Sequence, residues 1–351
     1  MASPWVSRQF ENTTLFSRGR PSLRWPLGSV RHPIRFQACP DCCCGPELFG
    51  SPRGVDARLI PNSVLPYGWM LFGAIAFSIM AALTHALGES WDWQIIAASR
   101  TALALVFATA LTLRAGAKLV FWQPKTLWIR SISGSISLVC TFYALTRLPV
   151  ADVLTLTNVF PIWVALLSWP LLQERPSKEA WIAIGVALVG VVLVQQPHFE
   201  QGGRLPAILA LVSSVTTAIS MLGLHRLQQV DPRAIVAHFS GVALVVCLGS
   251  LAFLPNTALA SSHIDETSLL MMLGVGICAT TGQIFLTKAF AAGPPAKVSV
   301  VALTQVGFAM VFDVVIWGHK FSGITLAGMA LVMAPTAWLL VSQGRMAIED
   351  L

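Results

Sequence analysis

Long stretches without a charged side chain are the feature that most limits what this chain can fold into. From residue 59 onward, stretches free of Asp, Glu, Lys and Arg recur along the sequence, and a helix needs about 20 apolar residues to cross about 30 Å of hydrocarbon. Only 11% of the 351 residues are charged, against about a quarter in a soluble domain. The pattern excludes a water-soluble globular protein and predicts an all-α integral membrane protein with ten transmembrane helices. We place these helices near 66–87, 93–113, 128–146, 152–172, 180–196, 205–225, 234–254, 268–289, 297–317 and 322–342.

The basic residues between the predicted helices are distributed unequally, and cytoplasmic connections are the ones that retain positive charge. With the N-terminus inside, eight Arg in residues 1–63 and eleven later Lys and Arg, Arg130 among them, make 19 on the cytoplasmic side. Three lie outside (Arg147, Arg204 and Lys320), and Arg100 lies within a span. We therefore expect both termini in the cytoplasm and the protein in the plasma (inner) membrane. These topology signals account for the net charge of +7, so nucleic acid is not expected as a partner.

Residues 1–63 differ in composition from the rest of the chain. They are rich in Arg, contain several Pro and Ser, and have no apolar run long enough for a secretory signal. We interpret them as a basic, disordered cytoplasmic tail, with an over-long gene start or an organelle address as the alternatives. This tail contains a cluster of four cysteines, for which metal ligation and palmitoylation are the two alternatives. The cluster consists of Cys39, Cys42, Cys43 and Cys44.

The predicted helices contain an internal repeat. At an offset of 145 residues, Pro149 falls on Pro294 and Val153 on Val298, in the turn between helices three and four and in its counterpart between helices eight and nine. Each repeat then has five spans, and an odd number inverts the second repeat relative to the first. Inverted repeats with a substrate site near the midplane are common in secondary transporters. The predicted domains are a tail (1–63), two five-helix repeats (66–196 and 205–342) and a C-terminal cytoplasmic tail (343–351).

Several motifs of the first half carry a family resemblance. They are Arg-Ser-Ile-Ser-Gly-Ser from Arg130, Phe142 to Leu145, Leu148 to Asp152, Pro161, and Leu171 to Ser177. Together they resemble the EamA family of the drug/metabolite transporter superfamily, and the first half is most similar to the solute carrier family 35 G-type branch. The resemblance implies a ten-helix carrier, often an exporter, that works by alternating access without a nucleotide site. In the second half, Val306 and His319 stand where the family repeats a Pro and a Glu.

Polar side chains within the predicted spans are the candidates for a substrate site. An ionisable group is costly to place inside a bilayer, so we expect Arg100 to hold a carboxylate or phosphate, the alternative being a structural pairing with carbonyl groups. Uncharged donors and acceptors on the helices that line the central cavity in the family are further candidates, with interhelical hydrogen bonds as the alternative. They are Thr141, Tyr143, Asn158, Gln283 and Gln305.

Three other ionisable residues are candidates for proton or ion coupling: Asp313, His85 and His238. The alternatives are an interfacial carboxylate for the first and hydrogen-bonded packing for the two histidines. Structural or gating roles are expected for four residues near the predicted turns and helix breaks. These are Pro149, Pro161, Pro294 and Glu174.

Glycines on the fifth and tenth spans allow close helix approach. Gly185 and Gly190 lie on the fifth, and Gly323 and Gly328 on the tenth. These glycines could serve either the packing between the repeats or a contact between two copies in a homodimer.

Several catalytic and nucleotide-binding motifs are absent from the sequence. It contains no Walker A loop, HExxH or GxSxG. We expect a carrier that is not an enzyme and uses no cofactor or metal, with a small organic solute and the lipid bilayer as its partners. A non-transporting scaffold or regulatory subunit is the alternative; a membrane-embedded enzyme and a channel are less favoured rivals.

Overall fold

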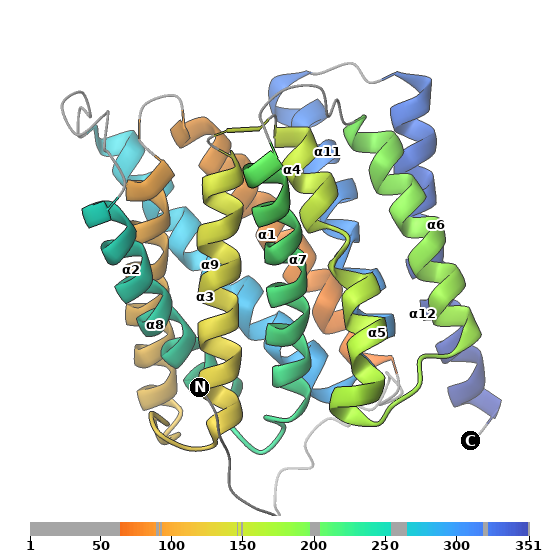
Figure 1. The fold of residues 1–351 in the computed structure, drawn as a ribbon, viewed down its shortest axis with the longest axis horizontal. Helices are drawn as coiled ribbons and strands as arrows, with labels where there is room; N and C mark the ends of the chain where they lie inside the picture. The colour runs from red at the N-terminus through yellow and green to blue at the C-terminus, as the bar shows by residue number, and fades with distance from the viewer. Residues whose placement is uncertain are drawn as a thin grey trace, which may run out of the picture. The chain divides into compact units, whose positions relative to one another are not determined.

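The computed structural model describes residues 64–88, 91, 93–145, 147–148, 150–196, 204–253, 265–318 and 322–349, all within one compact unit, Asp56–Leu351. The predicted tail and its cysteine cluster lie outside these residues. Within the described ranges the chain forms twelve helices and no strand (Figure 1). The helices are α1 (Leu65–Gly88), α2 (Trp93–Arg114), α3 (Lys125–Leu145), α4 (Val150–Thr157), α5 (Phe160–Leu172), α6 (Lys178–Gln195), α7 (Arg204–His225), α8 (Pro232–Phe253), α9 (Glu266–Ala292), α10 (Pro295–Ala302), α11 (Thr304–Trp317) and α12 (Gly323–Glu349).

These helices account for ten membrane spans. In the described part of the chain, nine stretches are long and apolar enough to cross a membrane, and two of them each combine two shorter helices, α4 with α5 and α10 with α11. The tenth span is α3, which has 21 residues but carries Lys125, Arg130 and several serines and is therefore less apolar. The predicted all-α fold with ten transmembrane helices is confirmed.

Two of the spans are interrupted at equivalent positions of the two halves. The fourth span breaks after Thr157, the last residue of α4. Pro161 explains this break, because proline lacks an N–H and its ring collides with the carbonyl group four residues earlier, which is that of Thr157. The ninth span breaks at Leu303 without a proline, and there the Thr304 hydroxyl donates to Val301 O at 2.7 Å. A side-chain hydroxyl that bonds to the backbone in this way competes with the regular helical pattern.

The packing of the helices has a twofold relation between the repeats. The most extensive contacts join α1 to α9, α3 to α7, α2 to α8 and α6 to α12, which are spans 1 and 8, 3 and 6, 2 and 7, and 5 and 10. The repeats are exchanged when span 1 takes the place of span 6, span 2 that of span 7, and so on. This exchange turns the pair 1 and 8 into the pair 3 and 6, and it leaves the pairs 2 and 7 and 5 and 10 unchanged. Each of these contacts joins one repeat to the other. The predicted inverted-repeat architecture is confirmed.

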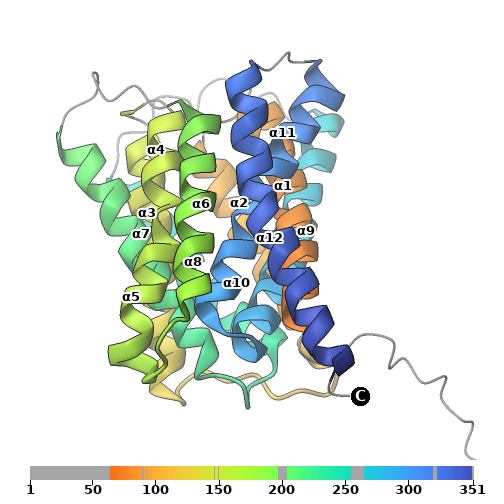
Figure 2. The same cartoon turned by 90° about the vertical axis from the view of Figure 1, so that its right-hand side faces the viewer.

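Two glycines allow α6 and α12 to pack side by side (Figure 2). A Cβ atom at Gly190 would lie 2.7 Å from Gly328 O, and one at Gly328 would lie 2.8 Å from Gly190 O. A larger residue at either position would push the two backbones apart. A Cβ atom at Gly185 or Gly323 would meet nothing within 4 Å. Gly190 and Gly328 therefore serve the contact between the repeats.

Candidate functional site

A cavity of about 220 Å³ lies between the two repeats. Its walls come from α2 and α3 of the first repeat and from α7, α8 and α9 of the second. The residues that line it are Arg100, Arg130, Gly134, Ser137, Leu138, Thr141, Thr217, Ser220, Met221, Phe239 and Gln283. Two of these residues are arginines, and this described lining includes no acidic residue.

One face of α3 forms a continuous wall of the cavity. Arg130, Gly134, Ser137 and Thr141 follow one another at spacings of three or four residues, which places them on one side of the helix. Between Arg130 and Thr141 the helix rises about 16 Å, at about 1.5 Å per residue. Arg130 lies near the start of α3 and Arg100 near the start of α2, and these two helices run in opposite directions (Figure 1). The two arginines therefore approach the cavity from opposite ends.

Arg130 is the largest fully buried side chain among the described residues, with 1% of its surface exposed. Its Nη2 donates to Gln283 Oε1 at 3.1 Å, and its guanidinium carbon lies 3.9 Å from the centroid of the Phe239 ring. Its Nε has no hydrogen-bond partner in the described part of the chain. A Cβ atom at Gly134 would lie 3.0 Å from Arg130 Nη1, and one at Gly223 would lie 3.2 Å from Arg130 Cβ. Two glycines thus leave the space for a charge that packs on a neutral amide and an aromatic ring.

Hydroxyl groups of α3 and α7 form a network along the same wall. Ser137 Oγ lies 2.9 Å from Ser213 Oγ and 2.6 Å from Thr217 Oγ1. Thr141 Oγ1 lies 2.6 Å from Ser213 Oγ. Each hydroxyl is both a donor and an acceptor, so this wall can accommodate either kind of group on a solute.

The structure brings three of the six predicted substrate-binding residues to this cavity, namely Arg100, Thr141 and Gln283. They come from α2, α3 and α9, so segments that are far apart in the sequence meet here. The structure shows that these three residues lie around one cavity. Their binding of a solute stays a prediction.

The other three predicted substrate-binding residues lie outside the lining. Tyr143 lies near the end of α3, with the Arg147 guanidinium carbon 5.7 Å from its ring centroid. Asn158 lies at the break between α4 and α5. Gln305 lies in α11, and its backbone carbonyl accepts a hydrogen bond from Ser78 Oγ at 2.9 Å. These three residues do not line this cavity, and their contact with a solute stays a prediction.

The candidates for ion coupling lie apart from the cavity. His85 is exposed in the last turn of α1. His238 is buried in α8, with Nδ1 2.8 Å from Ser131 Oγ and its ring 4.8 Å from the Trp128 ring, edge to face. It lines a second, mainly apolar cavity of about 510 Å³ between α2, α3 and α8. Asp313 lies in α11, and its side chain is outside the described part. Their roles in coupling stay predictions.

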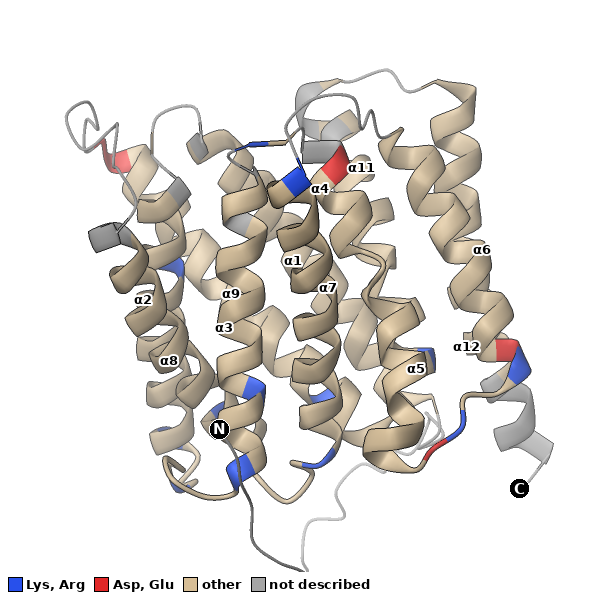
Figure 3. Ribbon diagram, in the orientation of Figure 1, with Lys and Arg blue, Asp and Glu red and all other residues tan. Residues whose placement is uncertain are grey.

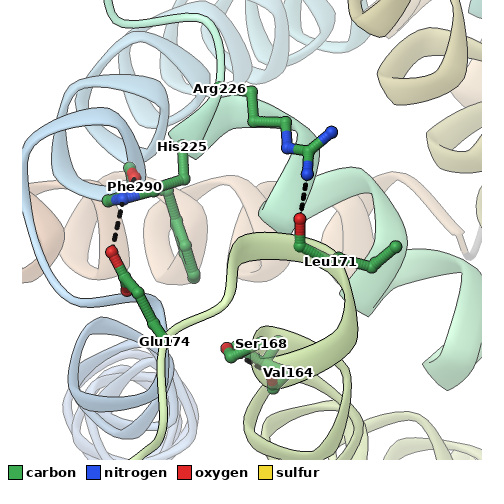
Figure 4. Close-up of polar contacts among 7 residues, drawn as sticks. All are labelled: Val164, Ser168, Leu171, Glu174, His225, Arg226 and Phe290. Atoms are coloured by element: carbon green, nitrogen blue, oxygen red, sulfur yellow. Dashed lines mark hydrogen bonds and ion pairs between the residues drawn. The ribbon is translucent and has the colours of Figure 1, made fainter. Parts of the chain in front are cut away.

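The two repeats also meet at the edge of the bundle where α5, α7 and α9 end (Figure 4). Glu174 Oε1 lies 3.2 Å from His225 Nε2, while His225 Nδ1 lies 3.1 Å from Phe290 O. Both partners are acceptors, so the His225 ring bonds to both only when both ring nitrogens carry a proton. Arg226 donates to Leu171 O beside this pair. Glu174, a predicted gating residue, thus joins the first repeat to the second.

Of the three predicted prolines, Pro294 lies near this edge, Pro161 lies at the break of the fourth span, and Pro149 is outside the described residues. A second ion pair between the repeats, Glu179 with Lys297, has a distance of 3.8 Å. Pro294 immediately precedes α10 and lines a cavity of about 170 Å³ together with the loop between α5 and α6. Pro161 is buried in the first turn of α5.

The sequence-based assignment of Arg130 to a cytoplasmic connection is wrong. Arg130 lies inside α3, and the Ser220 hydroxyl of α7 donates to its backbone carbonyl at 3.0 Å. Its position near the start of a span made it resemble a topology signal. Gly134, one turn later, is the signal that could have identified it, because a glycine at that spacing leaves room for a large side chain to turn inward.

Ten spans in two inverted repeats are an architecture common among secondary transporters. The model of the EamA-like transporter family matches residues 64–195 and 204–341, once in each repeat. The chain belongs to this family and is a multi-pass integral membrane protein.

Proteins similar to this chain include bacterial and mammalian transporters. The pseudopaline exporter CntI of Pseudomonas aeruginosa is 26% identical over 264 residues, which cover 75% of this chain and 91% of the relative. Solute carrier family 35 member G1 of Mus musculus is 24% identical over 327 residues, which cover 86% of this chain and 84% of the relative. A solved crystal structure with 17% identity and a TM-score of 0.69 covers 82% of this chain and 99% of its own and shares the fold.

Proposed function

We propose that this chain is a secondary transporter that carries small organic metabolites across a membrane by alternating access, as an exporter or exchanger. The observation that carries the proposal is the cavity between the two repeats, with walls from both and with arginine, hydroxyl and amide groups in its lining. In inverted-repeat transporters the substrate site lies at this interface, near the midplane. Export is supported by the relative that is named a pseudopaline exporter.

The symmetric packing supports alternating access. Because the main contacts join equivalent helices of the two repeats, a rocking of one repeat against the other yields a second arrangement of similar packing that opens at the other edge. The breaks after Thr157 and at Leu303 are places where the backbone can bend during this motion. A solute can shift the two populations only through its differential affinity for them.

The contacts at the edge near Glu174 are suited to a gate. The Glu174 side chain is 49% exposed and that of His225 is 17% exposed, and exposed ion pairs are worth about 0 to 1 kcal/mol. Weak contacts of this kind can break and form again in every transport cycle. In this proposal Glu174 closes the edge, while Pro161 and Pro294 fix where the neighbouring helices begin.

The distribution of charge supports the proposed orientation in the membrane. Lys and Arg gather at the edge where α3, α6, α8 and α10 begin (Figure 3). Arg147 and Arg204 lie at the opposite edge, where α3 ends and α7 begins. By the positive-inside tendency, the edge rich in Lys and Arg faces the cytoplasm. On this basis we place both termini inside, and we propose the plasma (inner) membrane as the location.

The proposal is tested with purified protein in liposomes that are loaded with a pooled metabolite extract. Exchange of the internal compounds against an isotopically labelled external pool is followed by mass spectrometry. Selective, saturable exchange of one class of compound is the expected result. A folded protein that exchanges nothing would contradict the proposal.

Replacing Arg100 with Ala is expected to abolish this exchange while the protein stays folded, because the substitution removes a charged group from the cavity wall. Arg114→Ala is the matched control, since Arg114 is exposed at the end of the same helix. Thermal unfolding in detergent checks the fold of both variants. Exchange kinetics of the Arg100 variant equal to those of the unmodified protein would remove Arg100 from the site.

A further inference from the structure

The two arginines of the cavity carry charge that the described protein does not balance. Arg130 is buried, and its neighbours at the guanidinium are the Gln283 amide and the Phe239 ring. Arg100 lines the same cavity. A guanidinium group stays charged in proteins, and a buried charge is costly unless it is paired.

Carboxylates of the described chain lie elsewhere. Asp152 is buried in the first turn of α4, and Glu174 and Glu179 lie on either side of the start of α6. Asp231 immediately precedes α8, and Asp265 and Glu266 lie at the start of α9. None of them belongs to the cavity lining. Among the described residues, the cavity therefore has two positive groups and no negative one, and a solute that carries negative charge would balance them.

From this arrangement we infer that the solute is a small organic anion with two acidic groups, one for Arg100 and one for Arg130; the inference rests on the proposed transport function. Guanidinium groups form paired hydrogen bonds with carboxylates in a planar, bidentate geometry. Arg130 Nε, buried and without a partner among the described residues, is a donor available for such a bond. The hydroxyls of Ser137, Thr141 and Thr217 lie along the wall between the two arginines and can bond to polar groups in the middle of the solute.

The volume of the cavity limits the size of this anion. Drug-sized ligands occupy pockets of about 300 to 1,000 Å³, whereas this cavity has about 220 Å³. At about 30 Å³ per water molecule, this volume corresponds to about seven waters and so to a solute of on the order of ten non-hydrogen atoms. Dicarboxylates of four to six carbons fall in this range. Cations are disfavoured because they would meet two positive charges.

The test compares solutes that differ in charge but hardly in shape. Liposomes with the full-length protein are assayed for exchange of labelled succinate and glutarate, and unlabelled succinate, glutarate, succinamide, glutaramide and putrescine are added as competitors. We expect saturable exchange of the two dicarboxylates. The dicarboxylates should compete at least tenfold more strongly than the uncharged diamides, and the diamine should not compete.

Variants of the two arginines connect this selectivity to the cavity. Arg100→Gln and Arg130→Gln should each raise the half-saturating concentration of succinate or glutarate at least tenfold and weaken the preference over the diamides. Arg114→Gln, at the exposed end of α2, is the control and should leave both quantities unchanged. Size-exclusion chromatography and thermal unfolding check each variant. If Arg130→Gln does not fold, the half-buried Arg100 provides the decisive variant, and Arg130→Lys keeps the charge while removing the bidentate geometry.

Two kinds of failure are distinguishable. If the metabolite pool shows exchange of neutral or cationic compounds and the dicarboxylates neither exchange nor compete, transport stands and the anion assignment is overturned. Unchanged selectivity in the folded Arg100→Gln variant overturns the assignment to this cavity as well. If a folded protein exchanges no compound of the pool and no dicarboxylate, the proposed function fails, and this inference fails with it.

Discussion

At the scale of single residues, Gly134 leaves space for both Arg130 and the cavity. A Cβ atom at Gly134 would lie 2.9 Å from Phe239 Cε2, 3.0 Å from Arg130 Nη1 and 3.0 Å from Ser220 Oγ. The glycine therefore sets both the position of the guanidinium group and the width of the cavity beside it.

We expect Gly134→Ala to lower the exchange rate about tenfold, because the added methyl group displaces Arg130 and Phe239 from the cavity wall. Overpacking of this kind also costs about 1 to 3 kcal/mol of stability, which thermal unfolding in detergent measures. Gly249→Ala in α8 is the control, since a Cβ atom there meets nothing within 4 Å. Equal exchange by the two variants would show that the position of the Arg130 guanidinium is not critical.

Single residues of the site could be predicted from the sequence only in part. Arg100 was identifiable because it interrupts an apolar stretch, and it does line the cavity. Arg130 was not, because a basic residue near the start of a span has the same appearance as a topology signal. The space that lets this side chain point into the bundle comes partly from Gly134 of the same helix, which the sequence shows. The rest comes from Gly223 of α7, and a single sequence does not show that pairing.

At the scale of helices, the charge-free stretches of the sequence predict the length and number of the spans. The sequence predicts only one of the two breaks within these spans. Pro161 marks the first break, since proline at that point removes a helical hydrogen bond. The equivalent break at Leu303 has no proline to mark it. There the competition between a threonine hydroxyl and the backbone decides the geometry, and threonine is common inside unbroken helices as well.

The close contact of α6 with α12 gives a prediction at this scale. Gly190→Ala places a methyl group 2.7 Å from a backbone oxygen of Gly328, so the two helices have to move apart, at a cost of about 1 to 3 kcal/mol. Gly185→Ala on the same helix meets nothing within 4 Å and serves as the control. Thermal unfolding of the two variants measures the difference, and equal midpoints would contradict the packing described for these helices.

At the scale of the whole molecule, few polar contacts between described residues join the two repeats at the edge that we propose faces the cytoplasm. The pair Glu174 and His225, together with Glu179 and Lys297, joins the repeats where α5, α7 and α9 end and α6 and α10 begin. The extensive packing between α1 and α9 and between α3 and α7 runs along the helices instead. In the proposed cycle, opening at this edge breaks these weak polar contacts and part of the apolar packing of α5 against α7, while α1 with α9 and α3 with α7 stay in contact.

Glu174→Gln should favour the arrangement that is open at this edge, because the amide removes the charge that holds the His225 ring. With an exposed ion pair worth about 0 to 1 kcal/mol, the open population rises by at most about fivefold. Hydrogen exchange of the backbone amides in residues 171–177 reports this change, since exchange proceeds through local opening. Glu266→Gln neutralises an exposed carboxylate at the other edge, where α9 begins, and should leave exchange in residues 171–177 unchanged. Faster hydrogen exchange in both variants, or in neither, would show that Glu174 does not act as a gate. The apolar interfaces would then control the rocking motion.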